Sequence, residues 1–180
     1  LPVAVKVPKP LAHATAAAAS PAVDDVVARF WRETAIHWAL RHVGVVAVYG
    51  AFVDADKSPP EHCLVMERCD GGRLDTALHA STAAASASLP QRVAWVTQTL
   101  RALAYLHRRD VIHGDIKAEN VLLVGGATAG AGAGAGAGMP PPLLLRAKLG
   151  DFGMAHIRRD VERSVGHTRS WGVQGSRAYM

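Results

Sequence analysis

Apolar residues recur along the chain at two spacings, and each spacing predicts a type of secondary structure. The segment 3–7, VAVKV, alternates and is rich in β-branched valine, which predicts a strand. Short apolar runs at 45–53 and 63–66 also have the length and composition of strands. Two more runs, at 121–124 and 147–150, flank a Gly/Ala-rich stretch and predict a small hairpin.

Two longer segments have the spacing of amphipathic helices. The segment 24–42 starts with two acidic residues, which suit the positive end of a helix dipole, and Gly44 follows as a stop signal. Its residues at helical spacing are Val26, Phe30, Glu33, His37 and Leu40. The segment 88–109 starts with a capping box of Ser88 and Gln91. Its apolar face consists of Val93, Val96, Leu100, Leu103 and Leu106. Strands, a long helix and then a hairpin predict an α+β fold.

Three stretches carry little pattern and predict surface insertions. The segment 8–20 is rich in Pro and Ala, 79–88 is rich in Ala and Ser, and 125–142 contains alternating Gly and Ala followed by prolines. Glycine at every second position makes ordering costly in conformational entropy. Long loops cost little additional closure entropy, so the fold can accommodate these insertions.

Composition bounds the environment of the protein. The chain has 180 residues, 49% of them hydrophobic, a formal net charge of +5 and a pI of about 9.6. Because Lys and Arg are scattered, the basic balance predicts no specific nucleic-acid partner. No apolar run approaches the roughly 18 residues of a membrane span. Cys63 and Cys69 form neither a zinc motif nor a disulfide framework, which predicts a reducing compartment, cytoplasmic or nuclear rather than secreted.

Polar residues interrupt one apolar stretch in an ordered way. In 111–124, VIHGDIKAENVLLV, an Asp, a Lys two residues later and an Asn five residues later lie between apolar anchors, and Asp-Phe-Gly follows at 151–153. This pattern resembles the catalytic loop and metal-binding segment of the protein kinase family. The likeness extends to VAVK around Lys6, FWRETAIHWALRH around Glu33, LVMERCDGGRL at 64–74 and GSRAYM at the end of the chain.

The resemblance implies a bilobal protein kinase fold that is incomplete. It assigns 1–66 to part of the small lobe, 67–72 to the hinge and 73–180 to part of the large lobe, with inserts at 79–88 and 125–142. The chain begins at the lysine strand, without the Gly-rich phosphate loop, and ends before the APE motif of the family. We therefore expect the isolated fragment neither to fold well nor to phosphorylate a substrate.

The resemblance also implies a role for each polar residue of the site. Lys6 would bind the ATP phosphates, and Glu33 would hold Lys6 through an ion pair. Asn120 and Asp151 would bind Mg²⁺, which prefers oxygen ligands. Asp115 would orient the substrate hydroxyl and accept its proton, and Lys117 would neutralise the transferred phosphate.

Apolar and backbone groups would bind the adenine. Ala4 and Leu122 match the residues that enclose the ring, and Met66 matches the gatekeeper. Glu67 and Cys69 would offer backbone hydrogen bonds. His113 and Phe152 match members of the stacked spine, in which His37 stands where Leu or Met is usual, so that its buried imidazole needs a partner.

The resemblance favours a serine/threonine kinase, because Asp-x-Lys-x-x-Asn is typical of that class; Ser176 would lie near the catalytic residues. The implied partners are ATP, a protein substrate with Ser or Thr, and an upstream activating kinase. Gly114 replaces the usual arginine beside the catalytic Asp, so activation-loop phosphorylation of Ser164, Thr168 or Ser170 is expected to matter less.

Two alternatives remain open at the level of sequence. A pseudokinase would use the same fold for binding or scaffolding, and bulky or acidic residues in place of a Gly-rich loop would favour it. A nucleic-acid binder driven by basic charge would show a steep salt dependence of binding.

Overall fold

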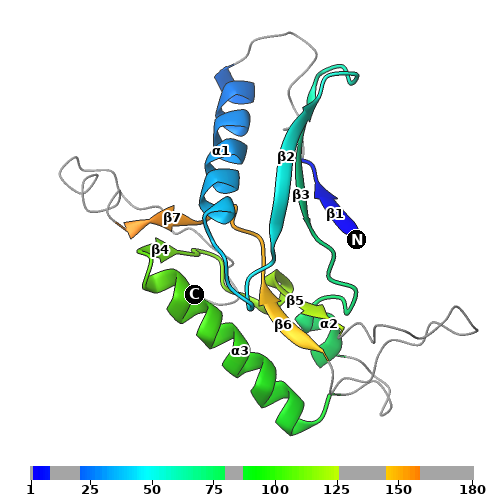
Figure 1. The fold of residues 1–180 in the computed structure, drawn as a ribbon, viewed down its shortest axis with the longest axis vertical. Helices are drawn as coiled ribbons and strands as arrows, with labels where there is room; N and C mark the ends of the chain where they lie inside the picture. The colour runs from blue at the N-terminus through cyan, green and yellow to red at the C-terminus, as the bar shows by residue number, and fades with distance from the viewer. Residues whose placement is uncertain (1, 9–20, 80–86, 126–144, 159–180) are drawn as a thin grey trace, which may run out of the picture.

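The computed structural model describes residues 2–8, 21–79, 87–125 and 145–158. Within them, a strand-rich N-terminal part is followed by a part built around one long helix (Figure 1). The predicted α+β architecture is confirmed. The inserts at 8–20, 79–88 and 125–142 lie largely outside the described residues, as do the hydroxyl residues from Ser164 to Ser176.

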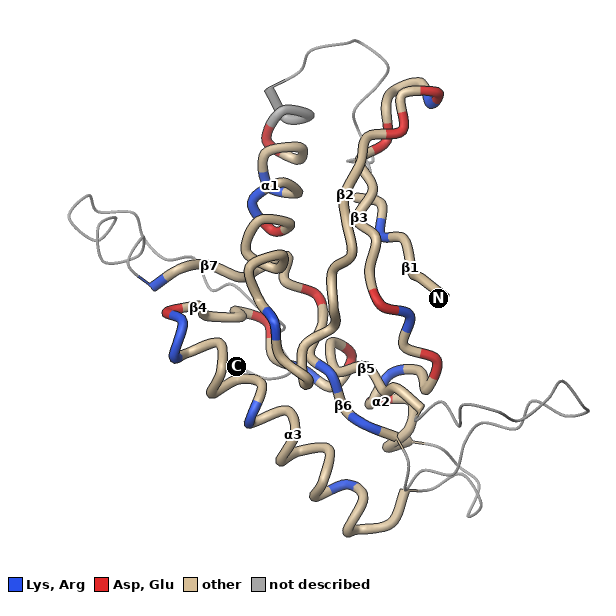
Figure 2. The backbone as a smooth tube through the Cα atoms, viewed as in Figure 1, with Lys and Arg blue, Asp and Glu red and all other residues tan. Residues whose placement is uncertain are grey.

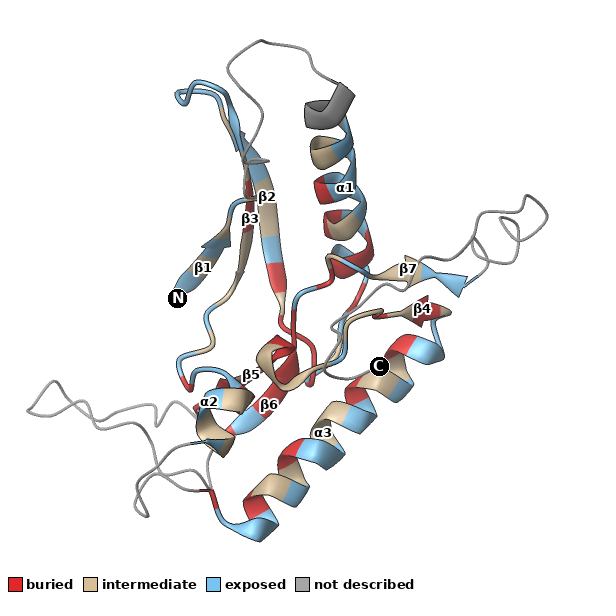
Figure 3. Ribbon diagram, turned by 180° about the vertical axis from the view of Figure 1, so that it is seen from behind, coloured by how far each residue is buried: buried red, intermediate tan, exposed pale blue. Residues whose placement is uncertain are grey.

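A three-stranded antiparallel sheet forms the N-terminal part. Its order is β1 (Val3–Lys6), β3 (Glu61–Glu67) and β2 (Val48–Asp54). In the β1–β3 register Lys6 lies opposite Leu64, and Ala4 lies opposite Met66. Helix α1 (Pro21–Trp38) packs on one side of the sheet (Figures 1 and 3), where Phe30, Val48 and Leu64 make a small buried cluster.

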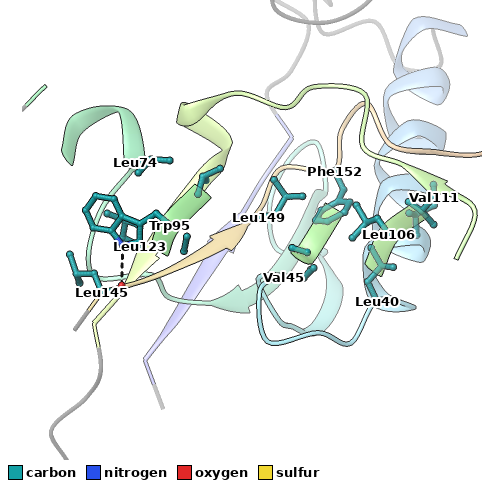
Figure 4. Close-up of a cluster of buried hydrophobic side chains, with 14 of the residues drawn as sticks. Leu40, Val45, Leu74, Trp95, Leu106, Val111, Leu123, Leu145, Leu149 and Phe152 are labelled. Atoms are coloured by element: carbon teal, nitrogen blue, oxygen red, sulfur yellow. Dashed lines mark hydrogen bonds between the residues drawn. The ribbon is translucent and has the colours of Figure 1, made fainter. Parts of the chain in front are cut away.

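The second part consists of helices α2 and α3, a 3₁₀ turn and two small two-stranded β units. The β5–β6 hairpin pairs Val121 with Leu149 and packs against α3, while β4 pairs with β7. The elements are α2 (Leu74–Leu78), α3 (Leu89–His107), β4 (Val111–Ile112), the 3₁₀ turn η1 (Ala118–Asn120), β5 (Val121–Val124), β6 (Arg146–Leu149) and β7 (His156–Ile157). The larger core lies between α3, the hairpin and the end of α1, and includes Trp95, Leu106 and Phe152 (Figure 4).

Helix α3 buries a different face from the expected one. Val93, Val96 and Leu100 are each more than half exposed, although Leu106 is buried as predicted. The buried side instead contains Gln91, Trp95 and Ala102 (Figure 3). Trp95 Nε1 and Gln91 Nε2 both donate to the carbonyl of Leu145, at 2.9 and 3.1 Å. Polar ends of otherwise buried side chains thus attach α3 to the residue just before β6.

The ends of the two long helices also differ in detail from the predictions. Helix α1 stops at Trp38, four residues before the expected end, and a turn closed by Leu40 N–H to His37 O follows. Only half of the capping box forms: Ser88 Oγ accepts from Gln91 N at 3.4 Å, but the Gln91 side chain binds Leu145 instead of returning to the cap.

Strand β2 begins at Val48 rather than at residue 45. The preceding residues belong to another contact: Val45 forms a parallel bridge with Leu149, and Val46 N donates to Leu149 O at 3.0 Å. The connection from α1 to β2 therefore runs along β6. Among the described residues, no helix combines the length and apolarity required to cross a membrane.

Candidate active site

Lys6 lies at the centre of a three-residue charge cluster. Its Nζ is 2.5 Å from Glu33 Oε1 and 2.9 Å from Asp151 Oδ1. Strand β1 supplies the lysine, the middle of α1 supplies the glutamate, and the segment after β6 supplies the aspartate. Three residues that are far apart in sequence therefore meet at one ammonium group.

The charges in this cluster stabilise one another. Burial by itself would lower the pKa of Lys6, but hydrogen bonds and charges from Glu33 and Asp151 outweigh it, so the pKa is raised above 10.5. Burial would raise the pKa of Asp151, but its contacts with Lys6 and the backbone N–H of Gly153 lower it below 3.8. At neutral pH Lys6 is therefore an ammonium and Asp151 a carboxylate.

Asp151 has an unusual backbone conformation. Its φ is +55°, in the left-handed region that non-glycine residues rarely adopt. Residues held in this region at a cost in energy cluster at functional sites. The side chain is about half exposed, at 51%, so one face of its carboxylate is accessible.

The loop from 113 to 120 forms a second cluster of polar residues, next to the cluster around Lys6. Asn120 Nδ2 donates to Asp115 O and Asp115 Oδ2, at 2.8 and 2.9 Å, and Lys117 Nζ lies 2.7 Å from the same Oδ2. The hydrogen bond to Asp115 is the main reason that the pKa of Lys117 is raised. Gly150 N donates to Asn120 O at 2.9 Å, which attaches this loop to the residue before Asp151.

The amide orientation of Asn120 bears on metal binding. Because its Nδ2 binds Asp115, the amide oxygen Oδ1 faces away from that contact and is suited to a cation. Asn120 and Asp151 would then supply two hard oxygen ligands, and Mg²⁺ is commonly held by one or two protein oxygens plus substrate phosphates. Among the described residues, no group of three or more His, Cys, Asp or Glu side chains is arranged so that it could hold a metal ion. The residues present thus fit Mg²⁺ bound together with a phosphate.

Two buried histidines flank Phe152. The ring centroid of His37 lies 4.3 Å from that of Phe152, and the centroid of His113 lies 4.9 Å from it. His113 Nδ1 accepts from Asp115 N, so Nε2 carries the proton and donates to Gly150 O at 2.9 Å. The expected stack is present, and the imidazole of His37 has the polar partner that it requires, Val46 O.

Burial keeps both imidazoles neutral. The pKa of His37 is lowered from 6.5 to about 4, mainly by burial and also by the charge of Lys6, while the hydrogen bond to Val46 and the charge of Asp151 oppose the shift. Burial also lowers the pKa of His113.

The residues expected to form a hinge, 67–72, begin at the last residue of β3. Glu67 N–H donates to Ala47 O at 2.8 Å, so this N–H is engaged within the protein. The Glu67 carboxylate also turns inward: Oε2 accepts from Lys148 Nζ at 2.7 Å and from Ala47 N at 3.1 Å. Cys69 is half-buried, and burial together with the Glu67 charge raises the pKa of its thiol to about 11.

The residues expected around the adenine lie on adjoining strands. Ala4 and Met66 are opposite one another in the β1–β3 pair, and both are half-buried. Leu122 lies on β5 and forms an isolated bridge with Arg73, just after the expected hinge. The residues expected around the adenine thus come from both parts of the structure.

Gly114 occupies a position that requires glycine. Its φ is +81°, and a Cβ there would lie 2.6 Å from Met154 O. The left-handed backbone and the close approach of residue 154 both exclude a side chain. Gly114, which stands where the family usually has arginine, therefore lies where the backbone of Met154 leaves no room for a side chain.

One buried charged residue, Lys148, was not singled out by the sequence analysis. It is a buried lysine on β6, three residues before Asp151, and pairs with Glu67. A charge inside a short apolar strand was the available signal, because buried lysines require a partner. The other basic residues are spread over several elements, including α1, α3 and β6 (Figure 2).

Comparison with known proteins places these observations in context. A family model described as protein kinase domain matches residues 4–180. Salt tolerance receptor-like cytoplasmic kinase 1 of Oryza sativa subsp. japonica is 36% identical over 135 residues, which are 71% of this chain and 31% of that protein. Interleukin-1 receptor-associated kinase 1 of Mus musculus is 36% identical over 126 residues, 66% of this chain and 15% of that protein.

A third relative has a similar level of identity. Serine/threonine-protein kinase D2 of Homo sapiens is 34% identical over 137 residues, 74% of this chain and 13% of that protein. The chain thus spans less than a third of the length of each of these relatives.

Proposed function

The chain belongs to the protein kinase family, and on that premise we propose that it transfers the γ-phosphoryl group of ATP to Ser or Thr hydroxyls of protein substrates. One observation carries the proposal. Lys6 Nζ contacts both Glu33 and Asp151, while the loop that holds Asp115 and Asn120 is hydrogen-bonded to the residue before Asp151. Phosphoryl transfer depends mainly on such positioning and charge neutralisation.

Lys6 would bind the α- and β-phosphates of ATP. Glu33 supports this role because its carboxylate, with a side chain only 10% exposed, holds the ammonium in place. An ion pair that is mostly shielded from water is screened less by salt than an exposed one. Loss of Glu33 would leave Lys6 attached to Asp151 alone.

Asn120 and Asp151 would hold the magnesium ion. The ion, when bound with ATP, would neutralise charge on the phosphate oxygens. The left-handed backbone at Asp151 supports this role, because strain of this kind is maintained by the surrounding structure at functional sites. The hydrogen bond from Gly150 to Asn120 would keep the two ligands in register.

Asp115 would orient the substrate hydroxyl and accept its proton. The hydroxyl oxygen forms a bond to the γ-phosphorus, the bond from that phosphorus to the bridging oxygen breaks, and the proton passes to Asp115. Asn120 and Lys117 both bind Oδ2 of Asp115 and so fix the carboxylate orientation. The raised pKa of Lys117 keeps its side chain protonated, and the ammonium would neutralise charge on the phosphate during transfer.

The adenine would lie between Ala4 and Leu122, with Met66 as the gatekeeper. Because Glu67 N–H is engaged by Ala47 O, the carbonyl of Glu67 would serve as its hydrogen-bonding group. Cys69 would contribute through its backbone. Its thiol, which is largely protonated at neutral pH, would take no part in the chemistry.

Serine/threonine specificity rests on Lys117 and on the relatives. One relative is named a serine/threonine-protein kinase. Free thiols at Cys63 and Cys69 support a reducing compartment, the cytoplasm or nucleus. An upstream activating kinase remains part of the proposal, and the tight glycine at position 114 supports a reduced dependence on activation-loop phosphate.

The proposal is tested in the natural protein, expressed with any sequence that flanks residues 1–180 in its own reading frame. Asp115→Asn is expected to lower kcat by a factor of about 100 to 10,000, the usual contribution of a general base. Asp56→Asn, a carboxylate change in the exposed β2–β3 turn, is the matched control and should leave kcat unchanged.

A second readout separates an enzyme from a pseudokinase. Thermal unfolding should shift upward with Mg·ATP, and Asp151→Asn should abolish the magnesium-dependent part of that shift. A shift with Mg·ATP, combined with phosphate transfer no faster than in Asp115→Asn, would identify a pseudokinase and contradict the proposed activity.

A further inference from the structure

Helix α1 carries a second apolar stripe, on a side that neither the sheet nor the larger core covers. Ala28, Trp31, Ala35 and Trp38 follow one another at intervals of three, four and three residues. This is the a/d spacing of a helix that packs against another helix. All four residues are exposed, and exposed residues recur along the described part of the helix (Figure 3). These four residues are called the α1 stripe below.

The α1 stripe alternates between small and large side chains. Trp31 and Trp38 are 38% and 46% exposed, and seven residues, or about 10 Å of helix axis, separate them. Ala35 lies between the two indoles, so a large apolar side chain from another helix would fill the space over its methyl group. Single exposed apolar residues are common on protein surfaces, but aligned tryptophans make a continuous patch, which is typical of an interaction site.

Neighbouring side chains hold both indoles in place. The ring of Trp31 makes edge-to-face contacts with Phe30 and His62, with centroids 5.2 and 5.7 Å apart. The guanidinium of Arg41 lies over Trp38, 5.1 Å from the ring centroid, and its Nη1 also donates to the backbone carbonyl of the first residue of β2. Side chains that are already ordered lose little conformational entropy on binding, so the two tryptophans are suited to anchor a partner.

The charged groups that border the α1 stripe give it a positive rim. Arg32 follows Trp31 at an e position of the heptad, and the guanidinium of Arg41 lies on Trp38. Both arginines are exposed, and neither forms an ion pair within the described part of the chain. Asp25, which also lies at an e position, is compensated by Arg29 at 3.3 Å. Basic residues on α1 are visible in Figure 2. Charges at the e and g positions select the partner of a helix, so this rim complements acidic side chains.

We propose that the α1 stripe is a docking surface for an amphipathic helix of a partner protein, one that presents large apolar residues flanked by aspartate or glutamate. A second copy of the chain complements the stripe poorly. In an antiparallel pair of α1 helices Arg32 would face its own counterpart, and in a parallel pair it would face Val27, so neither arrangement offers it an acid. The net charge of +5 also opposes self-association. The inference concerns binding and does not depend on the proposed phosphoryl transfer.

The test uses the natural protein and two designed helical peptides of about three heptads as probes. Both peptides carry leucine at a and d; the acidic probe has glutamate at every e and g position, and the basic probe has lysine there. Ala35→Glu places a charge in the gap between the indoles, and Ala104→Glu, at an exposed alanine of α3, is the matched control. Arg32→Glu reverses the charge at a flanking position. Thermal unfolding close to the parental temperature shows that each variant is folded.

Fluorescence anisotropy of the labelled probes measures the affinities. The acidic probe should bind the parent with a micromolar Kd, at least about tenfold more tightly than the basic probe. Ala35→Glu should raise the Kd of the acidic probe about tenfold or more, whereas Ala104→Glu should change it less than about twofold. Arg32→Glu should weaken binding of the acidic probe and strengthen binding of the basic one, because it reverses the charge that selects between them.

Several results would overturn the proposal. They are an acidic probe that does not bind, equal binding of the two probes, or the same Kd for Ala35→Glu and Ala104→Glu. Sedimentation velocity without a probe tests the other occupant: a dimer of the parent that Ala35→Glu dissociates would make the α1 stripe a self-association surface and would also refute docking of an acidic helix. Phosphate transfer by Asp115→Asn tests the proposed function separately, so the failure of one proposal is distinguishable from the failure of the other.

Discussion

Removal of the Lys148 ammonium should destabilise the fold strongly unless Glu67 is changed with it. Lys148 is buried, with 8% of the residue exposed, and the Glu67 side chain is 19% exposed, so Lys148→Met would leave a carboxylate largely shielded from water. Breaking a buried pair on one side costs about 3–5 kcal/mol. Glu67 would keep its 3.1 Å hydrogen bond from Ala47 N and some contact with water, so we expect a loss of about 2–3 kcal/mol.

The double variant provides the decisive comparison. Glu67→Gln alone would leave Lys148 buried without its charge partner and should cost a similar amount. Glu67→Gln combined with Lys148→Met removes both charges and keeps an acceptor for Ala47 N, so it should cost about 1 kcal/mol or less relative to the parent. Urea unfolding of the natural protein and the three variants measures these differences through the midpoint and the m-value.

An exposed pair provides the control. Arg29 and Asp25 lie 3.3 Å apart on α1, with side chains 70% and 72% exposed, so Arg29→Met should cost less than about 0.5 kcal/mol. If Lys148→Met cost no more than Arg29→Met, or if the two single losses simply added in the double variant, the argument that Glu67 and Lys148 form a coupled buried pair would be wrong.

Three further predictions follow from backbone geometry, protonation and packing. Gly114→Ala should lower the melting temperature more than Gly72→Ala, since both have positive φ but only the first would place a Cβ against Met154 O; equal losses in thermal unfolding would contradict this. The pKa of His37, lowered from 6.5 to about 4, means that the unfolded chain takes up its proton first as pH falls. Between pH 7 and 4.5 the parent should therefore lose about 2 kcal/mol more in urea unfolding than His37→Leu does. Trp95→Phe should cost about 1–3 kcal/mol by the same assay, because it leaves a buried carbonyl short of one donor.

The sequence predicted the residues of the charge cluster better than it predicted which side chains are buried. The resemblance to the protein kinase family singled out Lys, Glu, Asp, Asn and Asp in that order, and the structure brings Lys6, Glu33 and Asp151 together. Their assigned roles remain predictions. The buried side of α3 could not be predicted from the sequence, because Gln91 and Trp95 are positioned by the carbonyl of Leu145, which lies 54 and 50 residues away in the chain.

The predicted start of strand β2 was wrong for a related reason. The run 45–53 is apolar throughout, and nothing local in it distinguishes the part that pairs with β3 from the part that pairs with Leu149. That choice depends on tertiary contacts between distant segments. The Glu67–Lys148 pair likewise joins residues 81 positions apart, beyond the reach of any local pattern.

The thiol at Cys69 has a consequence for chemical probes aimed at the nucleotide site proposed above. With its pKa raised to about 11, only about one molecule in ten thousand carries the thiolate at pH 7. Electrophilic warheads react with the thiolate, so acrylamide-type reagents directed at this cysteine should label it slowly even when they dock well. Selective covalent inhibition would have to rely on residence time rather than on intrinsic reactivity of the sulfur.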